Sequence, residues 1–368
     1  MPNLTILADG CRGMMARGMA ISTKTYTIEP VDLSTADDDL VREAAVLQNA
    51  MASERVPEDP PLSFEAFASR VRNRPSMVVI RDWLARSAEG ELVGRGFVVR
   101  FEADTNRHLR EAGIDVLPAH RRKGIAKQLF REIVAGAGEA DDIVLGFYTS
   151  DRVPSAAAFL KRVGAKTTLT MHTNQLDLSQ LDRTMVREWA GIETEGYRLE
   201  WIDGDVPDDQ MKSVIVAYDT MNTAPRGDSA MQDWNTTPEQ LREFDRSRRA
   251  MGRERRLVLA IREATGETAG YTELAYDPKI PHLSWQQGTA VIPSHRGHGL
   301  GKWLKAAMLE RALRDWPKAS LVRTGNADSN APMLAINTRL GFKPAWADSI
   351  WEVGIADARR YASEGSVS

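Results

Sequence analysis

The sequence predicts a two-domain α/β protein built from an internal repeat. The stretches "IDVLPAHRRKGIAKQL" (114–129) and "TAVIPSHRGHGLGKWL" (289–304) share one pattern, and their matching Pro, Arg and Gly residues lie 175 positions apart. A chain of 368 residues is long enough for two domains, each with its own core. Strand-like and helix-like segments also follow one another in the same order in both halves.

Each half begins with a short alternating strand and two helical stretches, expected at 25–31, 36–54 and 63–73 in the first half and at 197–203, 207–220 and 238–250 in the second. The start of the last helix is well marked, because Thr237 and Gln240 fit a capping box around Pro238. Two neighbouring strands should follow, at 76–84 and 92–101 in the first half and at 256–264 and 268–276 in the second.

A further strand should end at each repeated motif, and an amphipathic helix should begin after it. Each half then continues with a strand, a helix that ends at a glycine (Gly164 or Gly341) and a closing strand, with the strands expected at 142–148 and 167–176, and at 319–325 and 349–354. We therefore expect an N-terminal extension over 1–22, either disordered or crossing as an arm, a domain over 23–178, a linker helix over 179–196 and a second domain over 197–368.

Composition excludes several classes of function. The net charge of −3 gives no basic footprint for nucleic acid. Cys11 is the only cysteine, so an intrachain disulfide and a cysteine-based metal site are impossible. The sequence contains no run of 18 consecutive apolar residues, so it predicts no membrane-spanning helix. We expect a cytoplasmic protein without a metal.

The repeated motif, Arg-x-x-Gly-x-Gly/Ala between a strand and a helix, suits an anion. The first N–H groups of a helix lack intrahelical acceptors and carry the positive end of the helix dipole, so a phosphate can bind there. Small residues allow close approach, and a basic side chain adds a charge-assisted hydrogen bond. The expected cofactor-binding residues are Val116, Arg121, Arg122, Lys123, Gly124, Ile125 and Ala126 in the first copy, and Val291, Arg296, Gly297, His298, Gly299, Leu300 and Gly301 in the second.

These motifs resemble the acyl-CoA signature of the GCN5-related N-acetyltransferases (GNAT), and in particular of the tandem-domain members. The resemblance covers roughly 24–178 and 197–356, and the stretch 326–342 resembles the family's following helix. It implies a mixed, strongly twisted sheet flanked by helices in each half. It also implies that acetyl-CoA lies in a split between two central strands, with its pyrophosphate on the motif amides.

The resemblance favours the second half as the catalytic one. Family members often place a carboxylate base on the strand before the motif strand, and Glu273 stands there, although it fits an ordinary strand residue as well. The first half has no carboxylate in its matching strand before Glu102. Asn330 matches a family position near CoA, or is a plain helix cap. Asn337 occupies the position where the family has its tyrosine acid, so the acid stays unassigned.

Several other residues allow both a structural and a functional interpretation. Tyr271 and Tyr276 are candidate acids but more typical of strand packing, and His295 and His298 fit a phosphate turn better than a metal site. Trp285 fits core packing or the acceptor side. The loop 221–234, with Arg226, Asp228 and Asp233, could contact a substrate.

We therefore expect an acetyl-CoA-dependent N-acetyltransferase that acts on the primary amine of a small molecule. Attack should be direct, in a ternary complex, because Cys11 is the only thiol that could carry an acetyl group. Mycothiol synthase, and a catalytically silent acyl-CoA-sensing module, are the alternatives. The acceptor and the oligomeric state stay open.

Overall fold

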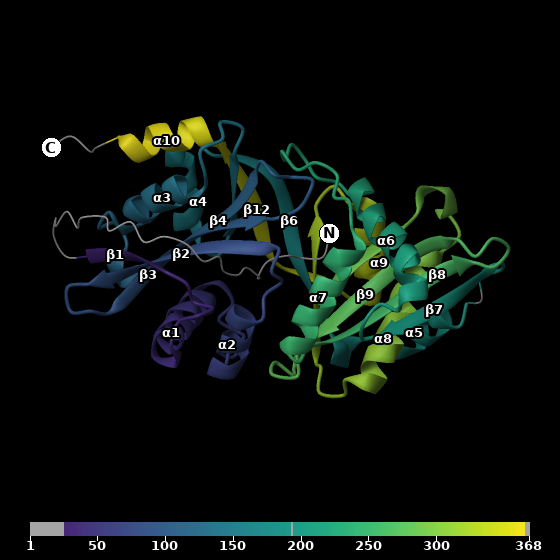
Figure 1. Cartoon of the computed structure of the whole chain (residues 1–368). Helices are drawn as coiled ribbons and strands as arrows, with labels where there is room; N and C mark the ends of the chain where they lie inside the picture. The colour runs from purple at the N-terminus through teal and green to yellow at the C-terminus, as the bar shows by residue number, and fades with distance from the viewer. Residues whose placement is uncertain (1–25, 193, 365–368) are drawn as a thin grey trace. The chain divides into compact units, whose positions relative to one another are not determined.

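The computed structural model describes residues 26–192 and 194–364 (Figure 1). The extension expected over 1–22 lies outside these residues. The described chain divides into two compact units. The N-terminal unit consists of residues 26–169, 228–231 and 349–364, and the C-terminal unit of Thr170–Gly227 and Gln232–Asp348.

The sheet of the N-terminal unit has the strand order β1-β2-β3-β4-β5-β12. Its strands are β1 (Tyr26–Val31), β2 (Val78–Ser87), β3 (Leu92–Phe101), β4 (Leu109–Val116), β5 (Val144–Ser150) and the second half of β12 (Lys343–Gly354). β4 and β5 are parallel, whereas β1 to β4 are antiparallel neighbours. The sheet is thus mixed.

Helices cover both faces of this sheet (Figure 1). One face carries α1 (Asp38–Arg55) and α2 (Phe64–Arg72), and the other carries α3 (Ile125–Gly136), α4 (Pro154–Val163) and α10 (Ile355–Ser363). Each layer buries its own apolar cluster against the strands.

The C-terminal unit repeats this design, with the strand order β12-β6-β11-β10-β9-β8-β7. Its strands are β6 (Lys166–Asp177), β7 (Tyr197–Asp203), β8 (Glu254–Arg262), β9 (Thr268–Tyr276), β10 (Leu283–Val291), β11 (Leu321–Ala327) and the first half of β12. β10 and β11 are the parallel pair.

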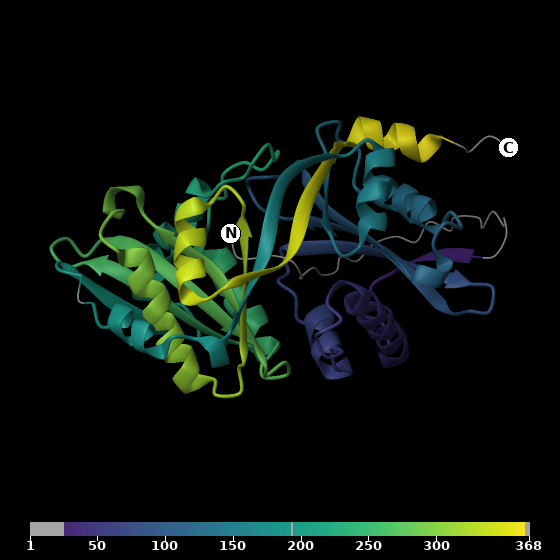
Figure 2. The same ribbon diagram turned by 180° about the vertical axis from the view of Figure 1, so that it is seen from behind.

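Two helical layers again enclose the sheet. Figure 2 shows the face covered by α5 (Arg183–Ala190), α8 (Leu300–Asp315) and α9 (Ala331–Leu340); α6 (Met211–Asp219) and α7 (Pro238–Ala250) cover the other. The capping box at the start of α7 is confirmed, since Thr237 and Gln240 cap each other's backbone N–H groups.

The end of the chain belongs to the N-terminal unit, whereas the sequence placed all of 197–368 in one domain. The expected strand 349–354 is the second half of the longer β12, and α10 follows it. The reason is packing: Trp351 and Ile355 lie in the core beneath α3, and Trp351 Nε1 donates to Thr149 Oγ1 at 2.8 Å.

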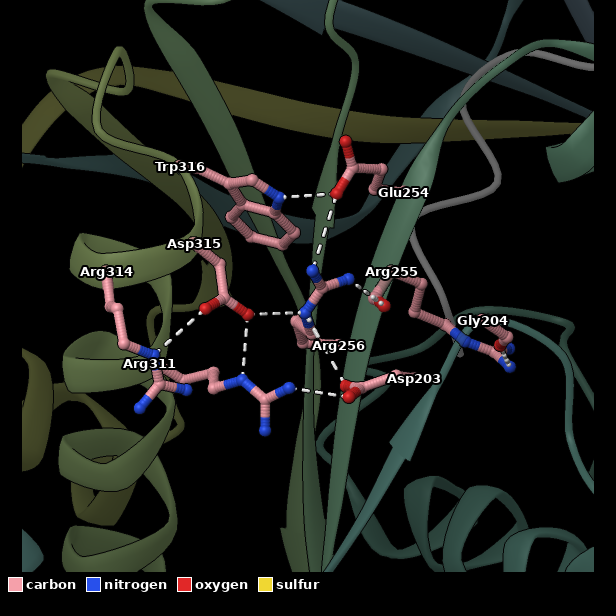
Figure 3. Close-up of polar contacts among 9 residues, drawn as sticks. All are labelled: Asp203, Gly204, Glu254, Arg255, Arg256, Arg311, Arg314, Asp315 and Trp316. Carbon is pink, nitrogen blue, oxygen red and sulfur yellow. Dashed lines mark hydrogen bonds and ion pairs between the residues drawn. The ribbon is translucent and has the colours of Figure 1, made fainter.

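An ionic network fixes the far end of α8 to the sheet (Figure 3). The Asp315 carboxylate accepts hydrogen bonds from Arg256 and Arg311, both at 2.8 Å, and from Arg314 at 3.1 Å. Burial alone would raise the pKa of Asp315, but these hydrogen bonds outweigh it and lower that pKa. Trp316 Nε1 donates to Glu254 at 2.8 Å beside this cluster.

None of the helices in the described part of the chain is both long and apolar enough to cross a lipid bilayer.

Candidate acyl-CoA site

The turn between β10 and α8 leaves its backbone N–H groups available to a ligand. Gly297 and Gly299 have φ values of 86° and 77°, the left-handed region that glycine adopts without strain. α8 begins at Leu300, and no side chain caps it. Among the described residues, the N–H groups of 297–301 find no acceptor. We call residues 296–301 the C-terminal seat.

The arginine of the C-terminal seat has no carboxylate partner in the described chain. Arg296 Nε donates to the Val291 carbonyl at 3.1 Å, and Nη2 donates to Thr223 Oγ1 at 2.9 Å. Both partners are neutral and the guanidinium is exposed. Its charge is therefore available to an anion at the turn.

The equivalent turn before α3, residues 121–126, is the N-terminal seat. Arg121 Nε donates to the Val116 carbonyl at 3.0 Å, which repeats the arrangement of Arg296. Its other two nitrogens, however, form a bidentate ion pair with Glu54 of α1, with Nη1 at 2.7 Å from Oε1. Arg122 also has a left-handed φ of 65° where the C-terminal seat has Gly297.

A tyrosine–histidine pair fixes each seat to a strand at the end of the sheet order, β7 in the C-terminal unit and β1 in the N-terminal unit. Tyr197 and His295 share a hydrogen bond of 3.0 Å, and Tyr26 and His120 one of 3.2 Å. Because the pair occurs in both copies, His295 has a structural role. No cluster of His, Cys, Asp and Glu in the described residues could hold a metal ion.

Each unit has a split between its parallel central strands. β10 pairs with β11 only over Leu283–Trp285, although β10 continues to Val291. β4 pairs with β5 only over Leu109–Ala112 and continues to Val116. We call the ends of β10 and β11 that do not pair with each other (286–291 and 324–327) the C-terminal split. It lies beside the C-terminal seat, because β10 leads into it.

The hairpin that borders each split differs between the two copies: of the described pairs β9–β10 and β3–β4, only β9–β10 contains a β-bulge. The β9–β10 register shifts between Gln286 and Thr289, whereas the β3–β4 register runs unbroken from Val99 to Gly94. A Cβ on Gly288 would lie 1.9 Å from the Tyr271 hydroxyl, so only glycine fits at the bulge. Such bulges re-aim backbone groups and are frequent beside active sites.

Glu273 lies on β9, on the face covered by α6, and is 9% exposed. Its carboxylate accepts a hydrogen bond from the Tyr218 hydroxyl of α6. Burial raises the pKa of Tyr218 well above its usual value, and the Glu273 charge adds to this. Tyr271 lies beside Tyr218, with 5.3 Å between ring centroids. The carboxylate is thus held in place by a tyrosine that stays protonated.

The other candidates are distributed between the site and the scaffold. Tyr276 stacks on Trp316 at 4.9 Å and its hydroxyl donates to the Pro281 carbonyl, so it belongs to the packing at the far end of α8. Asn330 precedes α9 without capping it through its side chain. Asn337 is 2% exposed, and its Nδ2 donates to Asn326 Oδ1 at 2.8 Å.

The loop 221–234 contributes to both units. Arg226 and Asp233 form an ion pair of 2.7 Å within it. Residues 228–231 belong to the N-terminal unit, where Ala230 N donates to Glu352 at 2.8 Å and the Ala230 carbonyl lies 2.9 Å from His108 Nε2.

Sequence reasoning missed three side chains at this site. Thr223 and Tyr218 contact Arg296 and Glu273 across 73 and 55 residues, and no local pattern marks such distant partners. Lys305 is a lysine on the buried side of α8. Its signal was present, because it follows Gly301 by four residues and therefore shares its helix face.

Comparison with known proteins agrees with these features. The sequence model of the family described as "Acetyltransferase (GNAT) family" matches residues 44–165 and 221–342, which together make up most of the chain. The chain belongs to this family. It carries two copies of the acetyltransferase domain, and the mixed sheet expected in each is confirmed. No curated protein matches the sequence significantly.

Several solved structures are similar over nearly the whole chain. A tandem GNAT protein from the clavulanic acid biosynthesis pathway has 27% identity and a TM-score of 0.74, covering 90% of this chain and 98% of its own. A GCN5-related N-acetyltransferase from Sphaerobacter thermophilus has 14% identity and a TM-score of 0.65, covering 90% and 96%. The N-myristoyltransferase of Saccharomyces cerevisiae with bound myristoyl-CoA has 11% identity and a TM-score of 0.58, covering 92% and 84%. The last two share the fold.

Proposed function

We propose that the protein is an acetyl-CoA-dependent N-acetyltransferase whose C-terminal unit binds acetyl-CoA and acetylates the primary amine of a small molecule. The observation that carries this proposal is the C-terminal seat, where free N–H groups of 297–301 and the unneutralised Arg296 adjoin the C-terminal split. A pyrophosphate fits the seat. The pantetheine arm of CoA could pair with strand edges in the split.

In this proposal Glu273 takes the proton that the amine loses on attack. An alkylammonium has a pKa near about 10, so a base is needed at neutral pH. Tyr218 holds the carboxylate in one orientation. Transfer is direct, because the only thiol of the chain, Cys11, would have to carry any acetyl-enzyme of the thioester kind. Incubation with acetyl-CoA alone should leave the protein unacetylated by mass spectrometry.

The first experiment measures acetyl-CoA stoichiometry by native mass spectrometry on the intact chain and on Gly299→Glu and Gly124→Glu. Each variant places a carboxylate in one seat. Space permits it, since a Cβ at Gly124 meets nothing within 4 Å and one at Gly299 meets only the Lys302 Cε, at 4.0 Å. Gly299→Asn and Gly124→Asn are the matched controls, because asparagine tolerates a positive φ without adding charge.

We expect one acetyl-CoA per chain, lost only in Gly299→Glu. No binding to the intact chain would overturn the function. Two molecules, each lost with its own variant, would overturn the restriction to the C-terminal unit.

A panel of primary amines, followed by CoA release, then tests the base. Glu273→Gln should lower kcat by about 10²-fold or more. Glu263→Gln changes an exposed carboxylate at the end of the neighbouring β8 and serves as the control. Equal rates in both variants would remove Glu273 from the mechanism.

A further inference from the structure

Lys305 faces the inside of the C-terminal unit from α8. It lies one helical turn after Gly301, so both residues share a face. A Cβ on Gly301 would lie 3.3 Å from Ile336 of α9 and 3.8 Å from Val291 of β10, which places that face toward α9 and the C-terminal split. Lys305 is 1% exposed, and its Nζ lies 5.4 Å from the centroid of the Phe342 ring.

Lys305 on α8 and the β-bulge on β10 lie at about the same distance from the C-terminal seat. Gly301 lies level with Val291, and Lys305 is four residues beyond Gly301, or about 6 Å along the helix axis. The chain reverses at the seat, and two residues back along β10 from Val291, about 7 Å, lies Thr289, where the bulge ends. An extended arm that leaves the C-terminal seat and enters the split therefore passes Lys305 and the bulge at the same depth.

No group in the described chain neutralises Lys305. It has no hydrogen bond or ion pair there, and its pKa is lowered to about 7 by burial alone. A buried ammonium whose charge meets only the face of the Phe342 ring in the described chain stays unfavourable, because a cation–π contact does not replace the hydration of the charge. The unit thus carries a destabilising side chain at this depth of the split.

Two buried asparagines, on β11 and α9, add further polar groups to the side of the C-terminal split that α9 covers. Asn326 lies on β11 beyond Arg323, the last residue that pairs with β10, and it accepts from Asn337 of α9. The Asn337 Oδ1 is buried and has no hydrogen-bond partner among the described residues. The C-terminal unit therefore buries two polar groups without a hydrogen-bond partner in the described chain, the Asn337 side-chain carbonyl on α9 and the Lys305 amine on α8, and such groups call for an explanation, of which a polar ligand is one.

The N-terminal unit shows that the fold requires neither Lys305 nor Asn337, whereas Asn326 corresponds to the polar Thr149. Phe130 precedes Lys305 by 175 positions, and Phe147 and Leu160 precede Thr324 and Asn337 by 177. Phe130 stacks on Phe147, with 6.1 Å between centroids. An apolar cluster therefore fills the same place in the other copy.

We propose that Lys305 donates the proton that the departing sulfur of CoA requires. The proposal rests on the function above. The amine nitrogen bonds to the acetyl carbon as the carbon–sulfur bond breaks, and the Lys305 ammonium gives its proton to the sulfur. The products are the amide and the CoA thiol. The proton released by the amine, through Glu273 and solvent, restores the ammonium. Asn337 orients the arm beside it.

The test measures the pKa of the thiol in bound CoA from the ultraviolet absorbance of the thiolate, which needs no acceptor. The thiolate of bound CoA favours the charged form of Lys305, so the two groups titrate as a coupled pair, and the thiolate should appear about one unit or more below the ordinary thiol pKa of about 8.5 in the native protein. Lys305→Met should abolish the shift while CoA still binds. Lys318→Met, at an exposed position beyond α8, should retain it.

The outcomes separate this inference from the proposed function. If CoA binds to the native protein and to Lys305→Met with equal thiol pKa values, the proton donor is wrong and the acetyltransferase stands. If the native protein binds no CoA, the acetyltransferase itself fails. If Lys305→Met and Lys305→Gln both remain folded but lose CoA, Lys305 is a binding residue and the donor role is overturned. In turnover, Lys305→Met should lose about 10²-fold in kcat with a smaller change in KM for acetyl-CoA.

Discussion

The two copies of the repeat share their turn and differ in what surrounds it. In both, the seat arginine donates to the carbonyl at the end of the motif strand, and a tyrosine–histidine pair connects the turn to β1 or β7. Arg121, however, is neutralised by Glu54, whereas Arg296 meets only neutral oxygens. Under the proposed function, turn geometry alone does not make an anion site, because the charge of the arginine must also be available.

The same division continues along the splits. The C-terminal copy has a β-bulge and a buried lysine, and the N-terminal copy has an unbroken register and a phenylalanine cluster. These differences favour packing in the N-terminal copy, as we would expect if the proposed function assigns it the role of a scaffold. The C-terminal copy retains groups that are unfavourable for stability, as functional sites commonly do.

The largest expected effect concerns the phenylalanine cluster. Phe130 is fully buried and contacts Phe147, Phe159 and Tyr361. Phe130→Ala should destabilise the N-terminal unit by about 3–5 kcal/mol in denaturant unfolding, while acetyl-CoA binding to the C-terminal seat persists. Val46→Ala removes an exposed side chain and is the control. A loss below about 1 kcal/mol would mean that the cluster is not the core of a scaffold.

The next effect separates the two arginines. Arg296→Gln should weaken acetyl-CoA binding by roughly 10-fold to 100-fold in calorimetric titration, because it removes a charge-assisted hydrogen bond worth about 1.5–3 kcal/mol. Arg121→Gln should leave the affinity unchanged and lower stability, since Glu54 loses its partner. Equal losses of affinity in both variants would mean that the seats do not differ as their ion pairs indicate.

The sequence predicted the features that depend on neighbours along the chain. The seat, the capping box of α7 and the order of strands and helices in each half follow from local turn chemistry and periodicity. The assignment of 349–364 to the N-terminal unit did not, because residues such as Trp351 and Ile355 fit any core until their distant partners are known. The Glu54–Arg121 ion pair spans 67 residues for the same reason.

Site residues divide along the same line. The candidates Val291, Arg296 and the seat glycines could be predicted from the sequence, because the motif that contains them occurs twice. Whether Glu273 faced a buried network could not be decided from the alternation of β9, whose residues are almost all buried. Lys305 could have been found from its spacing of four residues from Gly301, but a single lysine in a helix is usually exposed, and the sequence alone does not show that this one is buried.

A third prediction uses the buried lysine as a probe of stability. Lys305→Met should stabilise the C-terminal unit by on the order of 2 kcal/mol at pH 6, because it removes a desolvated charge. The folded pKa of about 7 lies below the unfolded value, so the folding penalty is complete below pH 7 and declines as the pH rises toward about 10.4. The gain measured by thermal unfolding should shrink accordingly. A pH-independent gain would show that the pKa of Lys305 is the same in the folded and unfolded chain, which would contradict a desolvated lysine.

The smallest expected effect lies at the other end of α8, in the network of Figure 3. Asp315→Asn should cost about 1 kcal/mol at pH 7, since three arginines lose their shared acceptor. The lowered pKa of Asp315 means that this stability is present above about pH 4, the unfolded value, and is lost as the pH falls further. Asp209→Asn, at an exposed carboxylate, is the control. Ala140 stands 175 residues earlier, so the N-terminal unit has no carboxylate at the matching position, and an equal loss of acid-sensitive stability in Asp209→Asn would show that the network of Asp315 is not its source.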